Sequence, residues 1–194
     1  SIMAGLEEPT TGKVFFKGHP PKDLSSSTCL VFQQFSLFPW YTVYENIVFP
    51  LKIKGVPRSH QQNKVNGLLK KFQLQGFSTH YPHEISGGMQ QLVAVARALA
   101  KDPEMLLLDE ALGSLDDKTR FEVIRILEEA WKASDKPPTV IFVTHHPDEA
   151  FLLADRVCIL THRPGRVREI IDITQDINAP KPRDIWSPQC QAFR

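Results

Sequence analysis

Short apolar runs alternate along the chain with longer stretches of helical periodicity. Three runs bounded by polar residues are predicted to be buried strands, namely Cys29–Phe32, Met105–Leu108 and Val140–Val143. The run Arg156–Leu160 and the alternating segment Arg166–Ile173 add two further predicted strands. Near the beginning of the sequence, Lys13–Lys17 is predicted to be an edge strand.

Apolar residues at intervals of three and four predict helices between these strands. The helices are expected at Ser59–Phe72, Gly87–Lys101 and Asp116–Ala133. Strands that alternate with helices form parallel sheets, because each crossover helix returns the chain to the same edge. The sequence therefore predicts an α/β fold. Thr42–Lys101 carries helix signals only and is predicted to be a helical insert between two strands.

Composition narrows the class of protein further. Hydrophobic residues make up 42% and charged residues 23% of the 194 residues, which is an ordinary globular balance. The 23 Lys and Arg against 22 Asp and Glu give a net charge of +1, so nothing favours a nucleic-acid partner. No apolar stretch reaches the roughly 20 residues of a membrane-spanning helix, and no basic segment leads into an apolar run. We expect a cytoplasmic protein.

Two carboxylates follow the most apolar predicted strand. Asp109 and Glu110 come directly after Met105–Leu108. Ligands of open parallel sheets bind beyond the carboxyl ends of the strands, so these acids face the expected site. One of them could hold Mg²⁺ and the other could orient a water for phosphoryl transfer. On this feature alone, a strand that simply runs into a polar turn is the stronger interpretation.

Three other positions carry candidate phosphate chemistry. Ser86-Gly87-Gly88 precedes a predicted helix, where an N-cap serine and two glycines suit a bound phosphate as well as a merely capped helix. His145 follows the predicted strand Val140–Val143 and could donate a hydrogen bond to a terminal phosphate. Gln33 follows the first predicted strand, and its neutral amide could bind Mg²⁺ or the attacking water.

The order of these features along the chain resembles the ATP-binding subunit of ABC transporters. Val31-Phe32-Gln33 resembles the Q-loop, and Ile85-Ser86-Gly87-Gly88-Met89-Gln90 resembles the signature motif. Leu106-Leu107-Leu108-Asp109-Glu110 is similar to Walker B, Ser114-Leu115-Asp116 to the D-loop, and Thr144-His145 to the switch histidine. The resemblance implies a P-loop NTPase-like core sheet with a helical subdomain, and the ligands ATP and Mg²⁺.

The resemblance also implies a role for each matching residue. Glu110 would polarise the attacking water, while His145 and Gln33 would sense the γ-phosphate. Asp109 and Gln33 would hold Mg²⁺. The remaining residues would bind the ATP held by the opposite subunit of a dimer, namely Ser86, Gly87, Gly88, Gln90 and Asp116. In these terms residues 1–41 form part of the core, residues 42–101 the helical subdomain with the signature motif, and residues 102–194 the remaining core.

The sequence around the Q-loop-like segment resembles that of one class of importer ATPases. Leu37-Phe38-Pro39-Trp40, Glu45-Asn46 and Arg163-Pro164-Gly165-Arg166 look most like the ATPases of nitrate, sulfonate and taurine importers. The implied partners are a membrane permease, a second ATPase subunit and, indirectly, a periplasmic substrate-binding protein. The implied location is the cytoplasmic face of the cell membrane.

The family's phosphate-binding loop, G-x-x-x-x-G-K-[ST], does not occur in the 194 residues. Ile2-Met3-Ala4-Gly5-Leu6 resembles the end of the helix that follows this loop, so we expect a chain truncated before Ser1 that lacks the loop and the N-terminal strands. Such a chain is expected to bind ATP weakly, to be inactive alone and to leave sheet edges unpaired. The alternative function is a non-hydrolytic module that lends its signature half-site to a partner or acts structurally.

Aromatic residues cluster where the helical insert begins. Phe35, Phe38, Trp40 and Tyr41 lie within seven residues of one another. The resemblance implies a groove here that receives a short cytoplasmic helix of the permease. Aromatic residues that only fill the core of the insert are an equally acceptable interpretation.

Overall fold

The computed structural model describes residues 1–20, 27–32, 36–133, 136–176, 183 and 187–193. The chain forms two compact units, residues 1–143 and residues 144–194, and each is described by itself. The three-part division at residues 41 and 101 stays a prediction.

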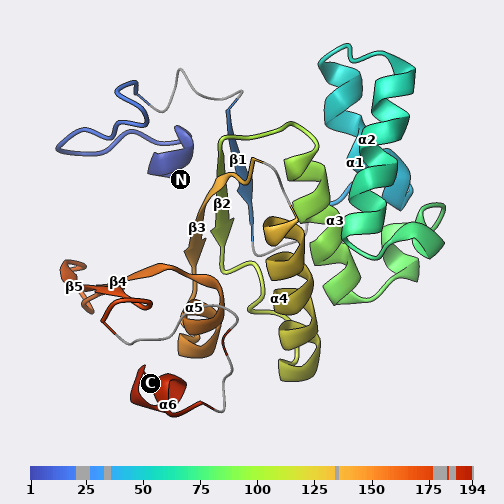
Figure 1. Cartoon of the computed structure of the whole chain (residues 1–194). Coiled ribbons are helices and arrows are strands. Elements are labelled where there is room, and N and C mark those ends of the chain that lie inside the picture. The colour runs from blue at the N-terminus through green and yellow to red at the C-terminus, as the bar shows by residue number, and fades with distance from the viewer. Residues whose placement is uncertain (21–26, 33–35, 134–135, 177–182, 184–186, 194) are drawn as a thin grey trace. The chain divides into compact units, whose positions relative to one another are not determined.

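A parallel sheet forms the centre of the first unit. Strands β1 (Thr28–Val31), β2 (Met105–Asp109) and β3 (Thr139–Val143) lie in the order β1-β2-β3 (Figure 1). In register, Leu107 of β2 lies between Leu30 and Ile141. Residues 105–108 are fully buried, as expected of a middle strand with neighbours on both edges and covered faces. The three predicted strands are therefore confirmed, but the burial predicted for the third is wrong. Residues of β3 are half-buried or exposed, because this strand lies at an edge of the described sheet.

Helices make up the chain between β1 and β2. They are α1 (Val43–Ile53), α2 (Arg58–Lys71), η3 (Gln75–Phe77), η4 (Pro82–Glu84) and α3 (Gly87–Leu99). One further 3-10 helix, η1 (Ile2–Ala4), precedes β1. Helix α1 begins at a capping box, in which the Thr42 side chain accepts a hydrogen bond from the Glu45 backbone and the Glu45 carboxylate accepts one from Thr42. The prediction of helices alone in this stretch is confirmed.

Helix α3 contacts several other elements of the first unit. It packs against α1, against β1 and against α4 (Asp117–Lys132), which follows β2 (Figure 1). Residues 91–96 of α3 are buried without interruption, so this helix is apolar on nearly all sides. Among them Gln91 is the exception, a fully buried amide whose Oε1 and Nε2 have no hydrogen-bond partner in the described part of the chain.

The second unit combines two helices with a hairpin. Helix α5 (Pro147–Leu153) precedes β4 (Arg156–Leu160) and β5 (Val167–Asp172), and α6 (Pro188–Phe193) ends the described chain. Strands β4 and β5 form an antiparallel sheet of their own, with Cys158 opposite Ile170. A connection of six residues after β4 suits a hairpin rather than a crossover. Among the described residues, the parallel sheet has three strands.

One predicted strand is wrong. Lys13–Lys17 does not form an edge strand; only Phe16 and His19 exchange backbone hydrogen bonds, of 2.8 and 3.0 Å. Between them Lys17 and Gly18 adopt left-handed conformations with φ of 51° and 82°. Two consecutive left-handed residues turn the chain back on itself and end any extended run.

Candidate functional site

The two acidic residues lie where the sequence placed them, at the carboxyl end of the central strand. Asp109 is the last residue of β2 and is exposed, and it lies opposite Val143 of β3. Glu110 follows in a left-handed conformation, with φ of 45°. Its N–H donates a 3.0 Å hydrogen bond to the Val143 carbonyl. This bond fixes the turn, so both carboxylates leave the sheet at the edge where ligands of parallel sheets bind.

The glycine pair begins helix α3 as predicted. The Ser86 hydroxyl caps the helix by accepting a 3.3 Å hydrogen bond from the Met89 N–H. The Gln90 amide donates to the Pro82 and Ile85 carbonyls, at 3.0 and 3.3 Å, and so ties the preceding 3-10 turn to the helix. Ser86 is exposed, so the N-terminal end of a 13-residue helix is open to an anion.

Gly88 brings this helix end close to a second one. A Cβ at Gly88 would lie 2.6 Å from Cγ2 of Thr119, in the first turn of α4. Helix α4 is capped by Asp116, whose side chain accepts a 3.1 Å hydrogen bond from the Thr119 N–H. Hydrogen bonds from Thr119 hold the pKa of the Asp116 carboxyl below its usual value. The structure thus brings the signature-like and D-loop-like residues onto two helix ends in close contact.

The predicted histidine lies in the second unit. His145 is exposed, and its ring centroid lies 4.1 Å from that of His146. The Thr144 hydroxyl donates to the buried Glu149 carboxylate and accepts a 2.9 Å hydrogen bond from the His146 N–H. These bonds fix the backbone on both sides of His145. Gln33, the remaining predicted catalytic residue, lies outside the described residues, as does Phe35.

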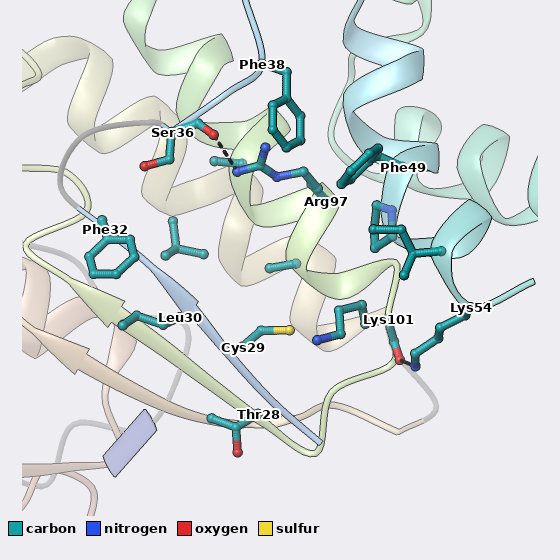
Figure 2. Close-up of a pocket in the computed structure, with 15 residues that line it drawn as sticks. Thr28, Cys29, Leu30, Phe32, Ser36, Phe38, Phe49, Lys54, Arg97 and Lys101 are labelled. Atoms are coloured by element: carbon teal, nitrogen blue, oxygen red, sulfur yellow. Dashed lines mark hydrogen bonds between the residues drawn. The ribbon is translucent and has the colours of Figure 1, made fainter. Parts of the chain in front are cut away.

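A pocket of about 450 Å³ lies beside the first strand (Figure 2). It is lined by residues of β1, α1 and α3 and by the segment that leads into α1. In that segment Phe38 contacts three other aromatic rings, with centroid distances of 4.7 Å to Phe49, 5.5 Å to Tyr41 and 5.8 Å to Trp40. Trp40 is 66% exposed, so the cluster is not wholly core.

One residue organises this segment, and the sequence did not identify it as functional. Asn46 is fully buried in α1. Its Oδ1 accepts a 2.9 Å hydrogen bond from the Phe38 N–H, and its Nδ2 donates to the carbonyls of Phe38, Tyr41 and Thr42. An asparagine four residues after a helix cap is the signal that could have indicated it, since its amide reaches back to the loop before the helix.

Comparison with known proteins identifies the family. The family model described as ABC transporter matches residues 1–113. The chain is 45% identical over 182 residues to an uncharacterized ABC transporter ATP-binding protein of Methanocaldococcus jannaschii, which covers 94% of this chain and 67% of that protein. It is 40% identical to an aliphatic sulfonates import ATP-binding protein of Bacillus licheniformis, over 100% of this chain and 72% of that protein. The chain belongs to the ABC transporter family.

A third relative and two solved structures agree. A taurine import ATP-binding protein of Burkholderia pseudomallei is 42% identical over 86% of this chain, which spans 64% of that relative's length. CbiO1 of Clostridium perfringens, part of the ABC transporter complex cbiONQ, has a TM-score of 0.79 at 26% identity, covering 89% of this chain and 70% of its own. A dimeric ATP-binding cassette bound to ADP and Pi has a TM-score of 0.72 at 31% identity, covering 89% and 78%. The α/β, P-loop NTPase-like fold class is confirmed.

No helix in the described part of the chain is long and apolar enough to cross a membrane.

Proposed function

We propose that this chain supplies the ATP-hydrolysing side of an importer for small organic anions of the sulfonate or taurine type. The observation that carries the proposal is the pair Asp109 and Glu110, fixed at the carboxyl end of β2 by the bond from the Glu110 N–H to Val143. Identity of 40% and 42% to relatives named for sulfonate and taurine import supports the choice of substrate class.

In this proposal the predicted residues divide the tasks of ATP binding and hydrolysis among them. Glu110 polarises the attacking water, and Asp109 with Gln33 holds Mg²⁺, for which carboxylate and amide oxygens are suitable ligands. The N–H groups at Gly87 and Gly88 and the Ser86 hydroxyl bind the phosphates of an ATP molecule held by a second subunit, with Gln90 and Asp116 fixing the two helix ends. His145 and Gln33 respond to the γ-phosphate.

The residues present fit nucleotide phosphates and Mg²⁺. At the start of α3 the cap residue Ser86 is exposed and can be approached by an anion, whereas Gly88 is buried against Thr119. Asp109 is exposed at the end of its strand, within reach of a hydrated cation. Mg-ATP bound there would supply the reactive γ-phosphoryl group, and the chain's own part is to orient water and stabilise charge.

The proposed partners follow from the same family. A second ATPase subunit would face the α3 end, in line with the dimeric cassette among the structural neighbours. A short helix of a membrane permease would dock in the pocket beside β1, which would place the chain on the inner face of the membrane, with a periplasmic binding protein acting through the permease.

The test is hydrolysis in a protein that also carries a phosphate-binding loop. Joining the strand and loop of the Bacillus licheniformis relative in front of Ser1 is expected to give Mg²⁺-dependent ATP hydrolysis. Glu110→Gln is expected to retain ATP binding but lose turnover, because an amide keeps the shape of the carboxylate without its charge. Glu122→Gln, an exposed glutamate of α4, is the matched control. Turnover retained in Glu110→Gln would place the catalytic carboxylate elsewhere.

A further inference from the structure

Helix α5 contains a buried carboxylate to which the proposed function gives no task. Glu149 lies in the first turn of this helix and is 2% exposed. The transfer of a carboxylate from water into a protein interior is unfavourable unless hydrogen bonds replace those of water. The Glu149 Oε2 accepts a 2.5 Å hydrogen bond from the hydroxyl of Thr144, five positions earlier in the chain. A buried carboxylate with a defined donor is a candidate for a specific task.

The Thr144 hydroxyl connects Glu149 to the backbone beside the predicted histidine. A hydroxyl has one hydrogen and two lone pairs. Because the hydrogen points to Glu149, the lone pairs of the Thr144 oxygen point away from the carboxylate, and the oxygen accepts a 2.9 Å hydrogen bond from the His146 N–H. Thr144 and His146 are the two neighbours of His145 in the sequence. One chain of hydrogen bonds therefore closes around this histidine.

This arrangement differs from an ordinary capping box. His146 is the N-cap residue of α5, and Glu149 is the third residue after it. In a capping box the carboxylate at that position accepts a hydrogen bond directly from the N-cap N–H, as Glu45 does from Thr42 in α1. In α5 a hydroxyl from outside the helix lies between the two groups. A direct bond would already start the helix, whereas the additional hydroxyl also fixes the residue before His145.

We infer that Glu149 is a positioning residue for His145. Through the Thr144 hydroxyl it holds the backbone on both sides of the histidine, so the exposed His145 ring leaves the chain in one direction. The inference rests on the proposed function, in which His145 responds to the γ-phosphate. It adds how the histidine is kept ready for that contact, since a hydrogen bond weakens steeply when its donor is misaligned.

Backbone relaxation of the 194-residue chain tests the inference without nucleotide. The amide order parameter of His145 is expected to be near that of rigid backbone, about 0.85. Thr144→Val removes the hydroxyl but keeps the shape of the side chain, and it is expected to lower this order parameter below about 0.6. Thr144→Ser keeps the hydroxyl and is expected to keep the high value, as is the matched control Thr139→Val at an exposed position of β3. An order parameter that does not change in Thr144→Val would overturn the inference.

A double variant separates positioning from stability. Thr144→Val removes a donor from the buried Glu149 carboxylate and is expected to unfold at a lower temperature. Thr144→Val/Glu149→Leu removes both polar groups and is expected to recover part of that loss, because neither member of the pair is left without the other. If the link positions His145, the double variant still has the low order parameter. Recovery of the order parameter together with stability would show that the link only stabilises α5 and would overturn the inference.

Hydrolysis by the protein with the joined phosphate-binding loop gives an independent readout. Thr144→Val and the double variant are expected to lower kcat about 10- to 100-fold, because misalignment of a contacting group costs that much, and to change KM for ATP less than about twofold. Thr144→Ser is expected to retain kcat. An unchanged kcat in the double variant, with Glu110→Gln inactive, would overturn the inference and leave the proposed function intact. No hydrolysis by the parent protein would instead overturn the proposed function, and the order parameter of His145 would then decide the positioning role by itself.

Discussion

Removal of the Asn46 amide is expected to loosen the segment that leads into α1 and carries the aromatic residues Phe38, Trp40 and Tyr41. Four backbone groups contact this side chain, but they do not lose equally. The Phe38 carbonyl also accepts a hydrogen bond from the Tyr41 N–H, and the Thr42 carbonyl also accepts one from the Asn46 N–H. Within the described structure, only the Phe38 N–H and the Tyr41 carbonyl are left without a hydrogen bond when the amide is removed.

Those two groups determine how much the free energy of unfolding falls in Asn46→Ala. An orphaned, partly buried donor or acceptor costs about 1–3 kcal/mol, and partial exposure places both near the lower end. Asn46→Ala is therefore expected to lower the free energy of unfolding by about 2–4 kcal/mol, including the small void left in a fully buried site. Asn46→Asp is expected to cost at least as much, because it places a carboxylate against the carbonyls of Phe38, Tyr41 and Thr42.

Urea denaturation followed by circular dichroism measures both variants. Asn66→Ala, an exposed position of α2, is the matched control and is expected to change stability by less than about 0.5 kcal/mol. A drop below about 0.5 kcal/mol in Asn46→Ala, with Asn46→Asp no worse, would refute the claim that this amide holds the segment.

Three further outcomes are expected. Gly88→Ala should cost about 1–3 kcal/mol in a denaturant titration because its Cβ would meet Thr119, and Thr119→Ser should restore part of the loss, whereas Gly67→Ala, with open space around it, should not destabilise. Asp116 has a lowered pKa in the folded state, so its contribution is present above its unfolded pKa and is lost as pH falls through the folded value; Asp116→Asn, still an N-cap, should flatten this acid limb of stability. Calorimetric titration of the 194 residues with Mg-ATP should show no micromolar binding, and a clean micromolar isotherm would contradict the reasoning.

Local chemistry explains what the sequence predicted well. The strand β2 was evident because a middle strand of a parallel sheet is apolar on both faces, which leaves an unbroken run at residues 105–108. Helix starts were equally evident, since Ser86 and Asp116 cap α3 and α4 through their own side chains. Candidate site residues at strand ends and helix starts could therefore be placed without tertiary information.

Features that depend on pairing or burial were not predictable in the same way. Helix α5 has only seven residues, too few to show a helical period in the sequence. The sequences of β4 and β5 predict two strands, but they do not indicate that these strands pair with each other and not with the parallel sheet. Asn46 and Arg97 are hydrogen-bonded to residues 8 and 61 positions away. A pattern of apolar and polar positions contains no information about such partners.

The same contacts connect the proposed catalytic side to the proposed docking pocket. Gln33 and Ser36 are three residues apart in the sequence. Even a fully extended chain of this length spans no more than about 11 Å. Ser36 is bonded to Arg97 of α3, and Phe38 is bonded to Asn46 of α1, so the far end of this short link is fixed to the helices and not free in solvent. In the proposed function Gln33 responds to the γ-phosphate, and we expect this response to reach the pocket wall through Ser36. Loss of either anchor would let the link absorb this response, so we expect the two anchors to matter for coupling and not for hydrolysis itself.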